Sequence, residues 1–126
     1  MEHANSYREL EVYKLSRELS LEIFEISKRF PKEEIFSLTD QVRRSTRSIG
    51  AQIAEAWAKR RYEKHFISKL TDADGENQET QHWLESAYDF HYITKSELNT
   101  LLSKYEPIGK MINSMINKSD LFCKGK

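Results

Sequence analysis

The sequence predicts an all-α protein: an antiparallel up-and-down four-helix bundle built from residues 1–126 as a single domain. Apolar residues recur every three or four positions along four segments, which is the period of an amphipathic helix. The 126 residues include only four Gly and two Pro, too few for the frequent turns of a β-sandwich or barrel. The chain is 38% hydrophobic and 32% charged, which fits one apolar core with solvated helix faces.

The first two helices are expected over residues 6–29 and 33–59, with Pro31 between them. Ser6 and Glu9 have the spacing of a capping box, which favours a helix start at the beginning of the first segment. Gly50 lies in the middle of the second segment. A glycine inside a helix costs up to about 1 kcal/mol relative to alanine, so it indicates a bend or a close contact with another helix.

The third and fourth helices are expected over residues 63–92 and 95–117. The stretch 71–81 reads TDADGENQETQ and contains a single apolar residue. Either the third helix is interrupted at Gly75, or this stretch faces water or a polar interface. The fourth segment has a heptad pattern of apolar residues. Residues 118–126 are expected to form a disordered tail.

The chain is expected to be a cytoplasmic protein with no membrane segment and no cofactor. Cys123 is the single cysteine, so no disulfide can form within one chain. The N-terminus has no apolar signal region, and no apolar run approaches the roughly 20 residues of a membrane span. Glu79 and His82 have a metal-ligand spacing found in di-iron bundles, but those sites need a second such motif and two further glutamates. We therefore expect no metal site and no enzyme.

The charge is zero overall but unevenly distributed. Residues 41–64 contain seven basic and two acidic side chains, whereas residues 65–97 contain two basic and seven acidic ones. Trp57 and Tyr62 are interleaved with the basic residues, and cations next to flat rings suit phosphate contacts and base stacking. The alternative is a solvated face whose arginines pair with the acidic segment of a neighbouring subunit. The predicted nucleic-acid or partner-binding residues are Arg43, Arg47, Lys59, Arg60, Arg61 and Lys64.

An ordered set of short motifs runs along most of the chain. It includes Phe30-Pro31-Lys32-Glu33-Glu34, Leu38-Thr39-x-Gln41-x-x-Arg44, Ser48-Ile49, Ile53-Ala54-Glu55, Ala73-x-Gly75 and Ile108-Gly109-Lys110-Met111-Ile112. Over residues 7–117 the sequence closely resembles the bacterial four-helix-bundle family of proteins encoded in 23S rRNA intervening sequences. It departs from the family pattern at Gly50, where a proline is usual, and at Ala56, where a glycine is usual. Asp74 and Glu76 also replace the Arg and Ser that more often flank Gly75.

The resemblance implies a homo-oligomer, specifically a ring-shaped homopentamer. It also relates the chain to the accessory variability protein of diversity-generating retroelements, which binds a reverse transcriptase and nucleic acid through a basic surface. Arg44 and Glu79 fall on family positions, and we interpret them as a structural ion pair within or between subunits.

The sequence therefore favours a non-enzymatic homo-oligomeric scaffold or accessory protein that binds RNA, DNA or a nucleic-acid enzyme. Two alternatives remain open. One is a ribonuclease of the HEPN kind, with His65 as general acid/base and Arg60 on the phosphate. The other is a purely structural oligomer without nucleic-acid affinity.

Overall fold

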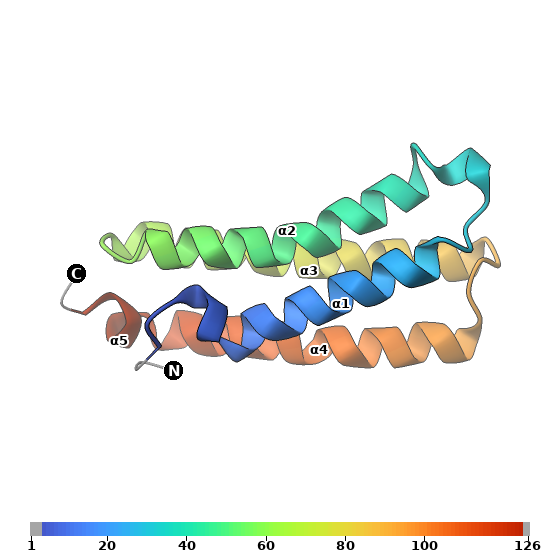
Figure 1. The fold of residues 1–126 in the computed structure, drawn as a ribbon. Coiled ribbons are helices and arrows are strands. Elements are labelled where there is room, and N and C mark those ends of the chain that lie inside the picture. Colours follow the sequence, from blue (N-terminus) through green and yellow to red (C-terminus); the bar gives the residue numbers. More distant parts are fainter. Residues whose placement is uncertain (1–3, 125–126) are drawn as a thin grey trace.

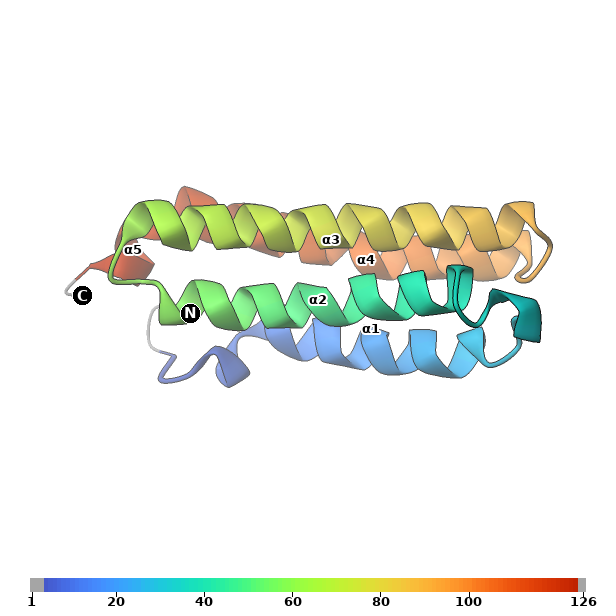
Figure 2. The same ribbon diagram turned by 90° about the horizontal axis from the view of Figure 1, so that it is seen from above.

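The computed structural model describes residues 4–124, which form a bundle of four long helices (Figure 1). Each long helix runs antiparallel to the preceding one, and α1 packs on α2, α2 on α3, α3 on α4 and α4 on α1 (Figure 2). The prediction of an all-α fold with four long helices is confirmed. The long helices are α1 (Glu11–Ser27), α2 (Leu38–Ala58), α3 (Glu63–Asp89) and α4 (Lys95–Asn117), and the short ones are η1 (Tyr7–Glu9), η2 (Lys32–Glu34) and α5 (Ser119–Cys123).

The first helix begins later than residue 6 because the chain is extended at Leu10. This residue has φ −71° and ψ 131°, and its side chain is fully buried in the core. The extended backbone turns Leu10 inward and separates η1 from α1. Ser6 accepts a hydrogen bond from the backbone of Arg8, so it caps the short η1 turn and not the long helix.

The second long helix begins at Leu38, not near residue 33, because Glu34 organises the loop before it. The Glu34 carboxylate accepts hydrogen bonds from the Ser37 hydroxyl (2.5 Å), the Leu38 backbone N–H (3.2 Å) and the Tyr92 hydroxyl (2.8 Å). The bond from Ser37, followed by that from Tyr92, lowers the pKa of Glu34 below its usual range. Glu34 thus caps α2 and ties the α1–α2 connection to the α3–α4 connection.

Helix α3 runs without interruption through Gly75, so the first of the two alternatives for this stretch, a break at the glycine, is wrong. Part of its polar stretch instead faces the core, where Asn77 and Thr80 are buried. Thr80 Oγ1 lies 2.9 Å from Ser45 Oγ on α2 and also donates to the Glu76 carbonyl. Next to Ser45 on α2, Thr46 Oγ1 lies 2.6 Å from the Tyr105 hydroxyl, which reaches across the core from α4. We call this set the mid-bundle polar layer: Ser45, Thr46, Asn77, Thr80 and Tyr105.

Gly50 brings α1 and α2 close together, as the second of its two sequence interpretations predicts. A Cβ atom at this position would lie 3.2 Å from Ser16 Oγ and 3.5 Å from Tyr13 Cε1 on α1. A larger side chain would force the two helices apart, which gives a packing reason for this glycine.

Helix α4 has the predicted bounds, 95–117, and begins with a strong cap. Thr94 and Glu97 form a capping box, each accepting a bond from the other's backbone N–H. Arg29, just beyond the end of α1, forms a bidentate ion pair with Glu97, with N···O distances of 2.6 and 3.0 Å. The Arg29 hydrogen bond, with help from the Thr94 backbone, lowers the pKa of Glu97 to about 2.

The prediction of a disordered tail over residues 118–126 is wrong for its described part. Residues 119–123 form α5, which folds back against α3. Phe122 is buried and stacks on Phe66, with ring centroids 5.7 Å apart. The Ser119 hydroxyl donates to a Glu63 carboxylate oxygen at the start of α3 (2.5 Å). An aromatic residue at 122 provides the apolar area that docks this segment. The last two residues of the predicted tail, 125–126, lie outside the described residues.

The Thr46–Tyr105 bond provides a test of the mid-bundle polar layer. Tyr105→Phe removes one partner and leaves the buried Thr46 hydroxyl unsatisfied, so we expect the free energy of unfolding to fall by about 1–3 kcal/mol. Thr46→Val combined with Tyr105→Phe removes both polar partners and is expected to cost less than the sum of the two single variants. Urea denaturation of the three variants measures the coupling, and strict additivity would contradict it.

The Arg29–Glu97 pair predicts a pH-dependent contribution to stability. Because the folded-state pKa of Glu97 is about 2 against an ordinary 4.5, its stabilisation is complete above pH 4.5. It is lost as the pH falls towards 2. We expect Glu97→Gln to be less stable than the wild type near neutral pH, with the difference shrinking across this window. Urea titrations at several pH values measure it. Glu106→Gln, on the exposed face of α4, is the matched control.

Candidate nucleic-acid interface

The turn between α2 and α3 gathers cations at one end of the bundle. Lys59 closes α2, Arg60 and Arg61 form the turn, and Lys64 lies in the first turn of α3. Lys59, Arg61 and Lys64 are exposed, and none makes an ion pair within residues 4–124. Basic side chains after α2 also suit the negative end of its helix dipole. Four predicted site residues therefore lie within one short segment.

Arg60 is held in place by the aromatic residue one turn earlier. Its guanidinium carbon lies 3.7 Å from the centre of the Trp57 ring, and its Nε donates to the Trp57 carbonyl at 2.8 Å. Burial lowers the pKa of Arg60 somewhat, but an arginine remains charged at any physiological pH. Tyr62 is 59% exposed and lies beside these cations in sequence and space. The turn thus offers an ordered cation and an accessible flat ring.

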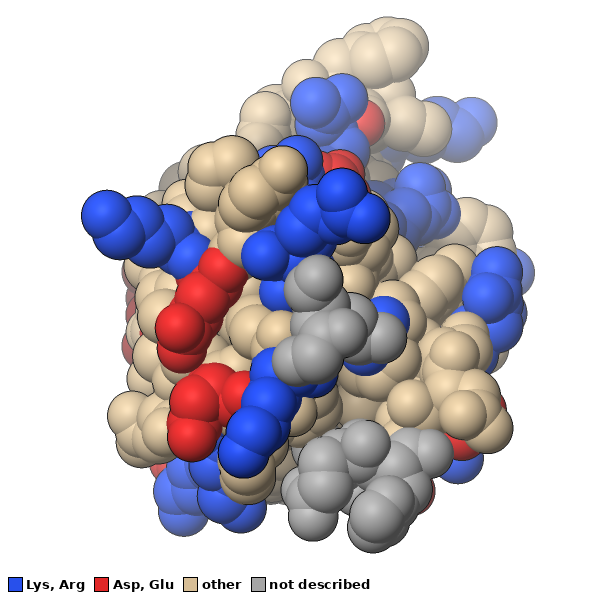
Figure 3. Space-filling view, turned by 90° about the vertical axis from the view of Figure 1, so that its left-hand side faces the viewer, with Lys and Arg blue, Asp and Glu red and all other residues tan. Residues whose placement is uncertain are grey.

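Lys124, just after the end of α5, is a further cation that sequence reasoning missed. Lys124 lines a shallow depression together with Arg61, Glu63, Asp120 and Cys123. Because the tail was expected to be disordered, Lys124 was not assigned to this end of the bundle. The aromatic Phe122 is the sequence signal that could have predicted the docking of this segment. Viewed end-on, this part of the molecule shows Lys and Arg side chains around a few acidic ones (Figure 3). We call Lys59, Arg60, Arg61, Lys64 and Lys124 the cationic end.

The remaining predicted arginines lie elsewhere on α2. Arg43 is used within the bundle: its Nε donates to Ser27 Oγ at 2.7 Å, and its guanidinium lies 4.7 Å from the Phe24 ring centre. Arg47 is exposed and lines a groove between α1 and α2. Arg47 is twelve residues from Lys59, or about 18 Å along a helix. The six predicted residues therefore do not form one continuous surface.

The predicted Arg44–Glu79 ion pair is not formed within the described part of the subunit. Glu79 instead accepts a hydrogen bond from the Trp83 indole at 3.0 Å, and the Arg44 side chain is exposed. The outer face of α3 carries Asp72, Glu76 and Glu79 together. Burial, then Glu79 and Asp72, raises the pKa of Glu76. A pair between subunits stays a prediction.

The two residues of the alternative ribonuclease pair, Arg60 and His65, contact different aromatic rings. Arg60 is stacked on Trp57, whereas the His65 ring packs near Tyr62 with centroids 5.5 Å apart. The two side chains therefore engage different neighbours. Within residues 4–124, no three His, Cys, Asp or Glu residues are grouped to hold a metal ion. No helix in the same range is both long and apolar enough to cross a bilayer.

The fold and the uneven surface charge define a small helical-bundle protein with one cationic end. Residues 8–114 match the family model of the 23S rRNA-intervening sequence protein, so the chain belongs to that family. This confirms the resemblance noted from the sequence motifs.

A solved structure shares both fold and sequence with the chain. It is a crystal structure of a protein with unknown function from the S23 ribosomal protein family of Bacteroides thetaiotaomicron VPI-5482. The two are 33% identical with a TM-score of 0.76, and the match covers 84% of this chain and 95% of the other. No curated protein matches the chain. Family and neighbour thus support the bundle and assign no activity to it.

Proposed function

We propose that the protein is a non-enzymatic, self-associating scaffold or accessory protein that contacts RNA or DNA through its cationic end. The observation that carries the nucleic-acid part is the stacked Arg60–Trp57 pair, flanked by the exposed Tyr62 ring and cations without an ion-pair partner in residues 4–124. Phosphates neutralise such cations, and bases stack on exposed rings. A nucleic-acid enzyme such as a reverse transcriptase would be brought to the same strand.

The opposite end of the bundle supports self-association. Phe36 is 93% exposed, and Phe90 and Ile35 are 61% and 52% exposed. Phe36 and Phe90 line a groove of about 490 Å³ together with Trp83. The Glu34 carboxylate orders the loop that presents Phe36. A rigid apolar projection beside an apolar groove is typical of a protein–protein interface.

For a ring, this apolar patch of one subunit would meet a different surface of the next subunit. Such a heterologous contact generates a closed ring when the rotation closes. The ring-shaped homopentamer that the family resemblance implies is such an assembly. Its cationic ends would then be repeated around the ring, so that one nucleic-acid strand meets several of them at once.

Nucleic-acid binding is tested with Arg61→Ala/Lys64→Ala, which leaves the packed Arg60 in place. We expect the wild type to bind a single-stranded RNA or DNA oligonucleotide with an affinity that falls steeply between about 50 and 200 mM salt. Loss of two phosphate contacts should lower the slope of log affinity against log salt by about 1.4 to 1.8. Fluorescence anisotropy across a salt series measures it.

Lys32→Ala/Lys110→Ala is the matched control, because it removes the same charge from exposed positions away from the cationic end. Equal slopes in the two double variants would show that overall charge, and not this end, governs binding. A wild type without binding at low salt would favour the purely structural oligomer.

Self-association is tested with Phe36→Asp, which would place a charge in the proposed interface without touching the core. We expect the wild type to elute with a mass several times the 14.9 kDa of one chain, and the variant to dissociate towards that mass. Size-exclusion chromatography with light scattering measures both. Leu121→Asp, 46% exposed at the cationic end, should keep the assembly. A monomeric wild type would contradict this part of the proposal.

A further inference from the structure

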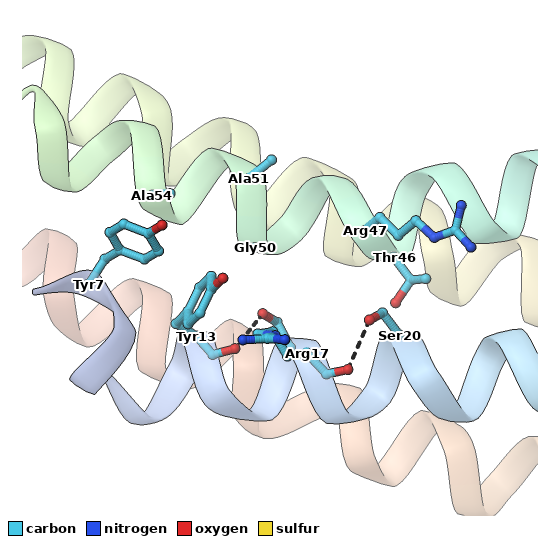
Figure 4. Close-up of a pocket in the computed structure, with 10 residues that line it drawn as sticks. Tyr7, Tyr13, Arg17, Ser20, Thr46, Arg47, Gly50, Ala51 and Ala54 are labelled. Carbon is cyan, nitrogen blue, oxygen red and sulfur yellow. Dashed lines mark hydrogen bonds between the residues drawn. The ribbon is translucent and has the colours of Figure 1, made fainter.

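A groove between α1 and α2 lies apart from the cationic end. It has a volume of about 340 Å³ and opens where α2 carries the small residues Gly50, Ala51 and Ala54. Gly50 itself packs against Ser16 and Tyr13, and the small side chains of Ala51 and Ala54 leave the neighbouring space between the helices unfilled. Tyr7 and Tyr13 line one part of the groove, and Figure 4 shows both rings reaching from the α1 side towards α2.

Two cations border this groove, one from each helix. Arg17 on α1 and Arg47 on α2 are both exposed lining residues. Within residues 4–124, neither guanidinium forms an ion pair with a carboxylate. By contrast, Arg29, just after the end of α1, forms one with Glu97 at 2.6 Å. Ser20 lies between them along the groove and adds a hydroxyl (Figure 4). A guanidinium group binds phosphate through two parallel N–H···O bonds, and no acidic side chain lines the groove to compete.

The aromatic lining supplies a second kind of contact. The Tyr7 and Tyr13 rings meet edge to face with centroids 4.8 Å apart, and Gly50 allows α2 to approach Tyr13 closely. The rings therefore hold each other in place. A flat heterocycle gains stacking energy on such a ring. The volume of the groove is within the range of small-ligand sites.

We propose that this groove binds a nucleoside phosphate, with the base against the tyrosine rings and the phosphate on Arg17 and Arg47. The Arg17 guanidinium lies 6.0 Å from the Tyr13 ring centre and the Arg47 side chain points away from it in Figure 4, so both side chains turn to the phosphate on binding. The ligand has two sources with the same chemistry: a free mononucleotide, or one nucleotide of a single strand. The groove shares no residue with the cationic end, so the two proposed sites can be tested independently.

Isothermal titration with AMP tests the site directly. We expect AMP to bind, and adenosine and inorganic phosphate each to bind at least about tenfold more weakly, because each supplies only one of the two contacts. Arg17→Gln/Arg47→Gln should reduce AMP affinity about tenfold or more. Ala51→Phe should do the same by filling the groove while keeping both charges. Arg44→Gln/Lys110→Gln removes two exposed cations outside the groove and should leave AMP binding unchanged.

The source of the nucleotide is resolved with a single-stranded oligothymidylate in the same variants. Weaker oligonucleotide binding in Arg17→Gln/Arg47→Gln and in Ala51→Phe would assign the groove to a nucleotide of the strand. AMP binding that needs the groove, with strand binding unaffected, would assign it to free mononucleotides. The proposal is overturned if both groove variants bind AMP and oligonucleotide as the wild type does, or if the wild type binds neither. Loss of strand binding in Arg61→Ala/Lys64→Ala alone would place the strand at the cationic end and reject the groove as a strand site, and the AMP titration then decides whether the groove binds free mononucleotides.

Discussion

The mid-bundle polar layer is the constraint on which the rest of the molecule depends. Apolar stripes on four amphipathic helices tolerate several axial offsets, because one leucine can replace another against a neighbouring helix. Buried hydroxyls do not, since each needs its partner within hydrogen-bond distance. The Ser45–Thr80 contact sets α2 against α3, and the Thr46–Tyr105 contact sets α2 against α4. A buried polar group that specifies register at some cost in stability is known from coiled coils.

With that register set, the two ends of the bundle acquire different chemistry. At one end, Phe122 of α5 packs between Phe66 and Trp57, and the Trp57 ring in turn orders Arg60. At the other end, Glu34 joins the two connections and leaves Phe36 projecting into solvent. One end is therefore suited to phosphates and bases, and the other to an apolar partner. The two ends differ because different side chains hold the connections between helices in place at each end.

The sides of the bundle differ as well. Gly50 draws α2 towards α1, and the small residues after it leave the groove bordered by Arg17 and Arg47. On the outer face of α3, burial raises the pKa of Glu76, and the nearby Glu79 and Asp72 raise it further. Asp72 on this face lies 3.9 Å from Lys69, whereas Glu76 and Glu79 form no ion pair within residues 4–124.

The sequence by itself determined the elements whose cause is local. The heptad pattern located α4 to the residue, and the period of apolar residues located the other helices within about five positions. Clustering of Lys59, Arg60, Arg61 and Lys64 was also readable, because they are adjacent in the chain. Only the tertiary structure decided the break at Leu10, the inward turn of Thr80 and the docking of Phe122, since each depends on a buried space formed by distant residues. It also separated Arg43 and Arg47 from the cationic end, because helix geometry assigns each arginine to a different neighbour.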